Sequence, residues 1–167
     1  PFDPLADASL PAGCTALYAG GGFPEVFAEP LAANRPLLDD VRRRVAGGLV
    51  TWAECGGLLW LSRSLDEHTM AGVIDAEATM TDRLTLGYRR ARACEDNPVA
   101  AAGGELRGHE FHYSATSPSG EALALRSRYH KGFGGFASPN LLATYLHMHL
   151  GTAPELAERY VAAASSP

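Results

Sequence analysis

The sequence predicts one α/β domain with a mainly parallel central sheet. Its 167 residues, 46% of them hydrophobic, are enough for one buried core and exclude a second full domain. The first third of the chain alternates apolar runs of strand length with segments of helical periodicity. Glycines follow the first strand directly at 20–22, and they follow the second at 56–57, one residue later, after Cys55. Because ligands of parallel sheets bind at the carboxyl ends of strands, we expect the chemistry at these glycines.

Strands and helices alternate over the first 65 residues. The apolar run 15–19 ends in a glycine turn and is typical of a buried strand. Apolar residues at helical spacing predict two helices within 24–48. The run 49–54 predicts a second buried strand, and 56–65 predicts a helix that begins one residue after Cys55.

The rest of the chain changes to short segments separated by turn signals. Residues 72–128 predict a sheet with turns, and its clearest strands are 107–114 and 121–127. Beyond it, the pattern predicts a glycine-rich loop over 131–140, an apolar strand over 141–150 and a closing helix over 153–164. A doubly wound domain normally has a strand and a helix before the first strand found here, so we expect the chain to lack them.

Charge and cysteine content restrict the partners. With 14 Lys and Arg against 19 Asp and Glu, the net charge of -5 provides no basic surface for nucleic acid or an anionic membrane. No apolar run approaches the ~20 residues of a spanning helix, and the first residues do not follow the pattern of a signal peptide. Three cysteines do not form a disulfide framework. We therefore expect a cytoplasmic protein without nucleic-acid or membrane partners.

Cys55 is a candidate nucleophile. The small residues Ala53 and Gly57 lie two positions before and after it, as a sharp strand-to-helix turn requires. Unpaired amides at a helix start would favour the thiolate, and that of Gly56 could face an oxyanion together with the amides of the 20–22 turn. The alternative is that Cys55 is a small buried hydrophobic residue.

Two pairs of histidines offer a base or a metal site. His147 and His149 are two residues apart on a predicted strand, so both would share a face, and one could activate Cys55. A metal-dependent hydrolase is the rival hypothesis, although HEFH is one residue short of HExxH and its histidines would lie on opposite faces of a strand. Its ligands would come from His109, Glu110, His112, His147 and His149.

Five segments spread along the chain form a specific combination. They are LYAGGGFPE at 17–25, TWAECGGLLWL at 51–61, LGYR at 86–89, RGHEFHYS at 107–114 and TYLHMHL at 144–150. Together they resemble the glutaminase domain of cobyrinic acid a,c-diamide synthases. This resemblance implies a three-layer, flavodoxin-like class I glutamine amidotransferase domain over residues 1–167. It also implies that the domain lacks its first strand and helix, and that an ATP-binding synthetase domain is absent.

The same resemblance implies a function and a set of site residues. Cys55 would be the nucleophile that hydrolyses glutamine through a thioester, and His147 its base. Ammonia would amidate the a and c carboxylates of a corrinoid in cobalamin biosynthesis, with ATP and Mg²⁺ in the missing domain and no cofactor or metal in this one. The expected substrate-binding residues are Gly21, Gly22, Gly56, Glu110 and His112.

Two departures from the broader class leave parts of the site open. His149 stands where class I enzymes carry a glutamate after the base, so a Cys–His dyad is expected unless Glu110 or another acid approaches. Leu59 stands where a glutamine often helps to hold substrate. A non-catalytic docking domain, the identity of the tetrapyrrole and the oligomeric state, including a homodimer, are open alternatives.

Overall fold

A four-stranded, mainly parallel sheet lies at the centre of the fold. The computed structural model describes residues 1–128 and 131–165. Strand β2 (Val50–Glu54) pairs in parallel with β1 (Ala16–Ala19) on one side and with β10 (Leu141–Thr144) on the other. Strand β9 (Phe136–Ser138) is added antiparallel at the β10 edge. The predicted α/β class and the mainly parallel central sheet are therefore confirmed.

Helices cover the two faces of this sheet and create separate cores. On one face, Leu17 and Ala53 belong to a core that includes the helices of the N-terminal half. On the other face, Trp52 packs edge-on against Tyr160 of α4, with ring centroids 5.6 Å apart. Within the described residues, every helix is too short or too polar to span a bilayer. The helical segments are η1 (Pro24–Phe27), α1 (Ala28–Ala33), α2 (Arg35–Ala46), α3 (Gly56–Leu61), η2 (Leu150–Thr152) and α4 (Pro154–Ala164).

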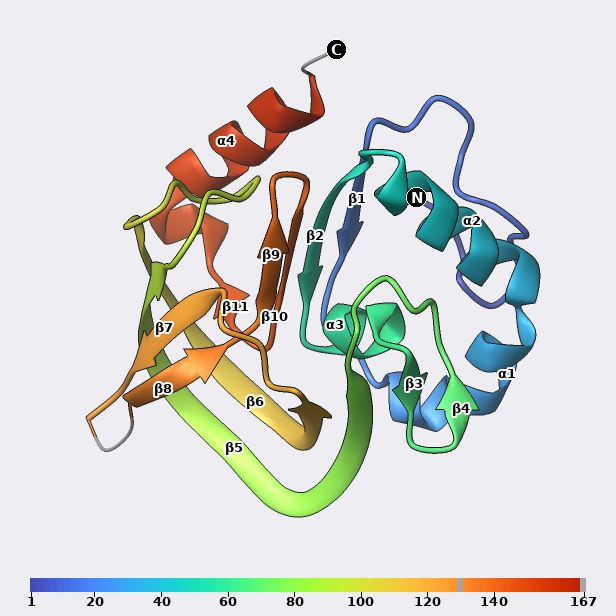
Figure 1. The fold of residues 1–167 in the computed structure, drawn as a ribbon, viewed down its shortest axis with the longest axis horizontal. Helices are drawn as coiled ribbons and strands as arrows, with labels where there is room; N and C mark the ends of the chain where they lie inside the picture. The colour runs from blue at the N-terminus through green and yellow to red at the C-terminus, as the bar shows by residue number, and fades with distance from the viewer. Residues whose placement is uncertain (129–130, 166–167) are drawn as a thin grey trace.

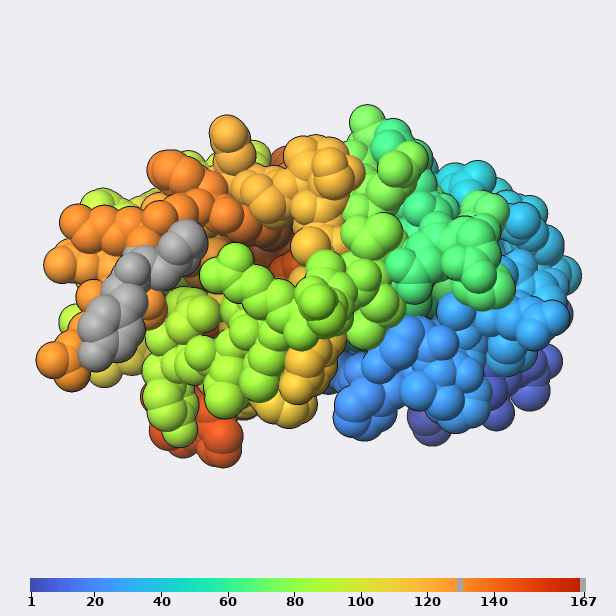
Figure 2. All heavy atoms as spheres, turned by 90° about the horizontal axis from the view of Figure 1, so that it is seen from below, coloured from blue at the N-terminus to red at the C-terminus, as the bar shows by residue number. Residues whose placement is uncertain are grey.

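A second sheet is built on one long hairpin, as expected for the turn-rich region. Strands β5 (Glu77–Ala93) and β6 (Glu105–Ser117) pair antiparallel, with a register shift between Met80 and Thr85 where β5 curves beneath the molecule (Figure 1). Seen from below, the green and yellow hairpin lies beside the blue N-terminal helices (Figure 2). The remaining strands are β3 (Ser64–Leu65), β4 (His68–Thr69), β7 (Leu123–Arg126), β8 (Lys131–Gly134) and β11 (His147–Met148).

Three expected elements differ in the structure. The expected loop 131–140 instead forms β8 and β9, because its glycines pair with β7 and its apolar end pairs with β10. The single strand expected over 141–150 divides after Thr144, whose Oγ1 accepts a hydrogen bond from the N–H of Leu146 at 3.1 Å and turns the chain into the second sheet. The helix expected over 56–65 ends at Leu61, because the chain continues into β3.

Candidate active site

Cys55 occupies a strained turn between β2 and α3, where the sequence predicts it. Its φ of 48° and ψ of −101° form a left-handed conformation that is rare for residues with a side chain. Its N–H donates to the carbonyl of Thr144 at 2.8 Å, and its carbonyl accepts from the N–H of Leu59 at 3.1 Å. Sheet and helix thus hold the thiol in the geometry of a nucleophile elbow.

The glycines around Cys55 allow the backbone segments to approach closely. A methyl group on Gly57 would collide with the carbonyl of Ala19 at the end of β1. A methyl group on Gly56 would lie 2.9 Å from the backbone nitrogen of Gly22. Gly22 and Gly56, both predicted to bind substrate, are therefore brought together next to the nucleophile.

His147 reaches the site from the second sheet. It lies on β11, which pairs antiparallel with β6 and places His147 opposite His109, with the two rings stacked at 5.1 Å. A methyl group on Gly108 would collide with the carbonyl of His147, so this glycine lets β11 approach β6. On the other side, a methyl group on Gly21 would lie 2.6 Å from Cε1 of the imidazole. The structure therefore places His147 between the glycine turn and the second sheet.

The immediate neighbours of His147 favour its charged form. Side-chain hydrogen bonding to Cys55 and to Glu54 raises the pKa of His147 to about 9, against the opposing effect of burial. The imidazole thus holds a proton at neutral pH where it faces the thiol. This electrostatic coupling unites the two residues that the sequence analysis selected as nucleophile and base.

Glu54 is the acid that the sequence analysis left open. Its carboxylate lies 3.7 Å from Nδ1 of His147, and its side chain is only 5% exposed. One oxygen accepts from the hydroxyl of Tyr18 and the other from the N–H of Met148, each at 3.1 Å. Burial and the charge of Glu54 raise the pKa of Tyr18 to about 12, so the hydroxyl stays a donor. The carboxylate is thereby held rigidly against the imidazole.

A small cavity of about 60 Å³ adjoins the thiol and includes one predicted substrate residue from β6. Its lining contains Cys55, Gly22 and His112. The Sγ of Cys55 lies 3.9 Å from the carbonyl of Phe111. Nδ1 of His112 lies 2.8 Å from the carbonyl of Ser114, and burial lowers the pKa of this histidine. Among the described residues, buried Nε2 of His112 has no hydrogen-bond partner.

Glu110 and His149 take positions apart from the thiol. Glu110 is ion-paired with Arg89 at 2.6 Å, with both side chains largely buried, and it does not line the small cavity. His149 is exposed at the start of η2, because β11 ends at Met148 and does not include it. In the part of the chain that the structure describes, no three His, Cys, Asp or Glu side chains are grouped to hold a metal ion.

Comparison with known proteins assigns a family to this geometry. Residues 1–154 match the model of the CobB/CobQ-like glutamine amidotransferase domain. The chain is 46% identical over 162 residues to hydrogenobyrinate a,c-diamide synthase of Streptomyces coelicolor, with 96% of this chain and 33% of that protein covered. It is 39% identical over 173 residues to cobyrinate a,c-diamide synthase of Dehalococcoides mccartyi, covering 96% of this chain and 37% of the relative.

The chain thus spans about a third of the length of these curated relatives. The crystal structure of a GMP synthase-like protein from Thermoplasma acidophilum superposes with a TM-score of 0.64 at 13% identity, covering 97% of this chain and 78% of that one. At this identity the likeness concerns the fold alone, and it agrees with the flavodoxin-like architecture expected from the sequence. The match over nearly the whole chain shows that it belongs to the family of CobB/CobQ-like glutamine amidotransferase domains.

Proposed function

We propose that this domain hydrolyses glutamine with Cys55 as nucleophile, His147 as proton carrier and Glu54 as the group that positions His147. The observation that carries the proposal is the joint placement of these side chains. Cys55 is held at a strained elbow, while His147 has a raised pKa and lies 3.7 Å from the Glu54 carboxylate. Covalent acyl transfer needs a nucleophile, a base and an acid that orients the base, and these three side chains would supply them.

The reaction proceeds in two steps. With His147 already protonated, Cys55 Sγ attacks the side-chain amide carbon of glutamine as the thiolate. The tetrahedral intermediate breaks its C–N bond, and ammonia leaves with a proton from His147. A water molecule then attacks the thioester, giving its proton to the imidazole, and glutamate leaves as the thiolate is restored. Glutamine and water are thus converted to glutamate and ammonia.

Backbone amides stabilise the negative charge of the intermediate. The backbones of Gly22 and Gly56 converge next to the thiol, so their N–H groups are the donors that we assign to the oxyanion. His112, which lines the adjoining cavity with Cys55, is the residue that we assign to contact the substrate glutamine. We assign Glu110 the role of holding Arg89, its ion-pair partner, and not a direct contact with the thiol.

We propose that the ammonia is used within a larger protein of the same kind as the relatives. Ammonia amidates the a and c carboxylates of hydrogenobyrinic or cobyrinic acid, as the names of the relatives suggest, in the cytoplasm. The 167-residue sequence has one lysine, Lys131, and no glycine loop ending in Lys and Ser or Thr. We assign ATP and Mg²⁺, which would activate the carboxylate, to a synthetase portion of the larger protein, in line with the greater length of the relatives.

Glutamate release by the purified protein tests the function. Cys55→Ala removes the nucleophile and should lower the rate by about 10³-fold or more. Cys94→Ala is the matched control, because Cys94 is exposed and far from the elbow in sequence, and it should keep full activity. A glutamine-analogue alkylator should label Cys55, and labelling at Cys14 would contradict the assignment.

The same assay separates the alternatives. A non-catalytic docking domain would release no glutamate above background in either cysteine variant or in the parent protein. A metal-dependent hydrolase would lose activity on treatment with a chelator and regain it with zinc. The described residues offer no cluster of metal ligands that supports this second alternative.

A further inference from the structure

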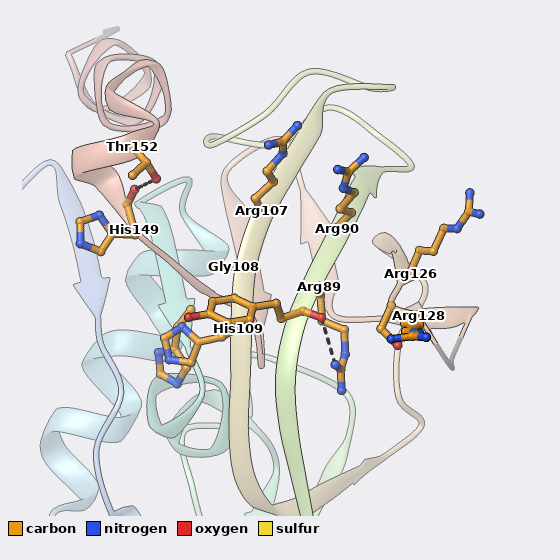
Figure 3. A pocket seen from close by; sticks show the side chains of 12 residues that line it. Arg89, Arg90, Arg107, Gly108, His109, Arg126, Arg128, His149 and Thr152 are labelled. Atoms are coloured by element: carbon orange, nitrogen blue, oxygen red, sulfur yellow. Dashed lines mark hydrogen bonds between the residues drawn. The ribbon is translucent and has the colours of Figure 1, made fainter.

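A groove beside His147 collects basic side chains. It has a volume of about 970 Å³, and no Asp or Glu is among those of its lining residues that the structure describes. His147 itself forms part of its wall, together with His109 and His149. We call this feature the arginine groove (Figure 3), after Arg89, Arg90, Arg107, Arg126 and Arg128, which line it.

Three of these arginines oppose one another directly across the second sheet. Arg90 on β5 is in register with Arg107 on β6 and with Arg126 on β7. Lys131 on β8 continues the row opposite Arg126. Like charges at directly opposite positions destabilise a sheet. Among the described residues, none of the three arginines forms an ion pair, although the chain carries a net charge of -5.

Strand β6 connects the row of arginines to the proposed catalytic centre. Arg107 lies two residues before His109 on β6, which corresponds to about 7 Å along the strand. The ring of His109 stacks on that of His147 at 5.1 Å. The arginine groove and the site of ammonia release therefore share a wall, and an anion bound in the groove lies next to His147.

The spacing of the row favours several carboxylates over one phosphate. Neighbouring strands are about 4.8 Å apart, so Arg107, Arg90, Arg126 and Lys131 span about 14 Å. In Figure 3, Arg90 and Arg107 extend side by side from adjacent strands, while Arg126 extends separately. A single phosphate would need donors that converge on one point, whereas each guanidinium fork matches a carboxylate of its own. The volume is that of a small-molecule site.

We propose that the arginine groove binds a polycarboxylate, with its carboxylates on Arg90, Arg107 and Arg126. The identity of this ligand rests on the proposed function: it is the acceptor, whose unreacted carboxylates are held by the row while one of them receives ammonia. Binding itself requires neither Cys55 nor glutamine. The groove then brings acceptor and nitrogen source to opposite sides of His147.

Calorimetric titration of the purified 167-residue protein with benzenehexacarboxylate at low ionic strength tests the proposal. The rigid hexacarboxylate should bind, and pyrophosphate and benzoate should bind at least about tenfold more weakly. The variant Arg90→Gln/Arg107→Gln should lose about tenfold in affinity or more, since each charge-assisted hydrogen bond contributes a comparable factor. Arg83→Gln is the matched control, because Arg83 is exposed on the same strand but does not line the groove.

Each outcome of the titration either supports or overturns the proposal. Absence of hexacarboxylate binding, or binding unchanged in the double variant, would overturn the proposal, and tighter binding of pyrophosphate would assign the groove to phosphate instead. Thermal melting of both variants checks that they are folded. Cys55→Ala should bind the hexacarboxylate like the parent protein. Intact binding in a protein that releases no glutamate would therefore contradict only the proposed function.

Discussion

The elbow around Cys55 and the arginine groove use opposite physical means. At the elbow, both oxygens of the buried Glu54 carboxylate accept hydrogen bonds, and glycines let backbone segments come into contact. In the groove, exposed like charges face one another across strands without ion pairs among the described residues for Arg90 and Arg107. The difference teaches that the first site depends on shape and the second on accumulated charge, so they should respond differently to substitution and to salt.

The largest loss of stability is expected at Gly57, where two backbone segments of the elbow lie in close contact. Gly57→Ala would place a methyl group against the carbonyl of Ala19, and overpacking of a buried site costs about 3 kcal/mol. The free energy of unfolding, measured by denaturant titration, should fall by this amount. Gly22→Ala is the control: its methyl group meets nothing within 4 Å, and stability should change by less than about 1 kcal/mol. Equal losses in both variants would contradict the importance of shape at the elbow.

A smaller, pH-dependent effect is expected from the carboxylate that holds His147. Cys55 and Glu54 raise the pKa of His147 to about 9, so the stabilisation from the bound proton is full below the ordinary value of 6.5 and is lost as pH rises through about 9. Glu54→Gln keeps the shape but removes the charge. We expect kcat for glutamine to fall about 10²-fold and its alkaline limb to move to lower pH.

The pH profile distinguishes positioning from a structural role. Glu25→Gln, at a glutamate that also lines the small cavity, should leave the alkaline limb in place. A Glu54→Gln protein that loses rate at every pH equally, with an unchanged limb, would show that Glu54 supports the fold and does not act on His147. Restoration of the parent limb by Glu54→Asp would support the positioning role.

The smallest effect should have the opposite sign. Arg90→Gln removes one member of the repulsive row, so the free energy of unfolding should rise by about 0.5 kcal/mol at low salt. High salt should abolish the gain, because exposed charges are screened. Chemical denaturation at two ionic strengths measures both effects, with Arg83→Gln as the control. A loss of stability in Arg90→Gln would contradict repulsion within the row.

Local patterns in the sequence predicted much of the fold and the position of Cys55 at a strand-to-helix turn. The strand–glycine–helix order identified Cys55, because small residues two positions away on each side are needed for the turn whatever packs around it. The same reasoning placed Gly21, Gly22 and Gly56 at neighbouring strand ends. His147 was also selected, although it reaches the site from the second sheet and not from the expected parallel strand.

The placement of Glu54, the arginine row and strands β8 and β9 depends on strand pairing, which local sequence patterns do not reveal. Glu54 directly precedes Cys55 in AECGG, but its role appears only when β11 brings His147 and the N–H of Met148 to its carboxylate. The arginine row requires the register of β5 against both β6 and β7, and a shift by one residue would turn its side chains to the other face. A glycine-rich segment likewise became β8 and β9 through partners distant in sequence.

Glu54 and Cys55 are consecutive residues, so peptide geometry keeps two of the three groups of the proposed mechanism close to each other. The remaining group arrives with β11, which approaches β6 closely because Gly108 has no side chain. Assembly of the proposed catalytic centre thus depends on the docking of the two sheets. In the proposed mechanism, turnover of glutamine depends on the integrity of the long hairpin as directly as on the thiol itself.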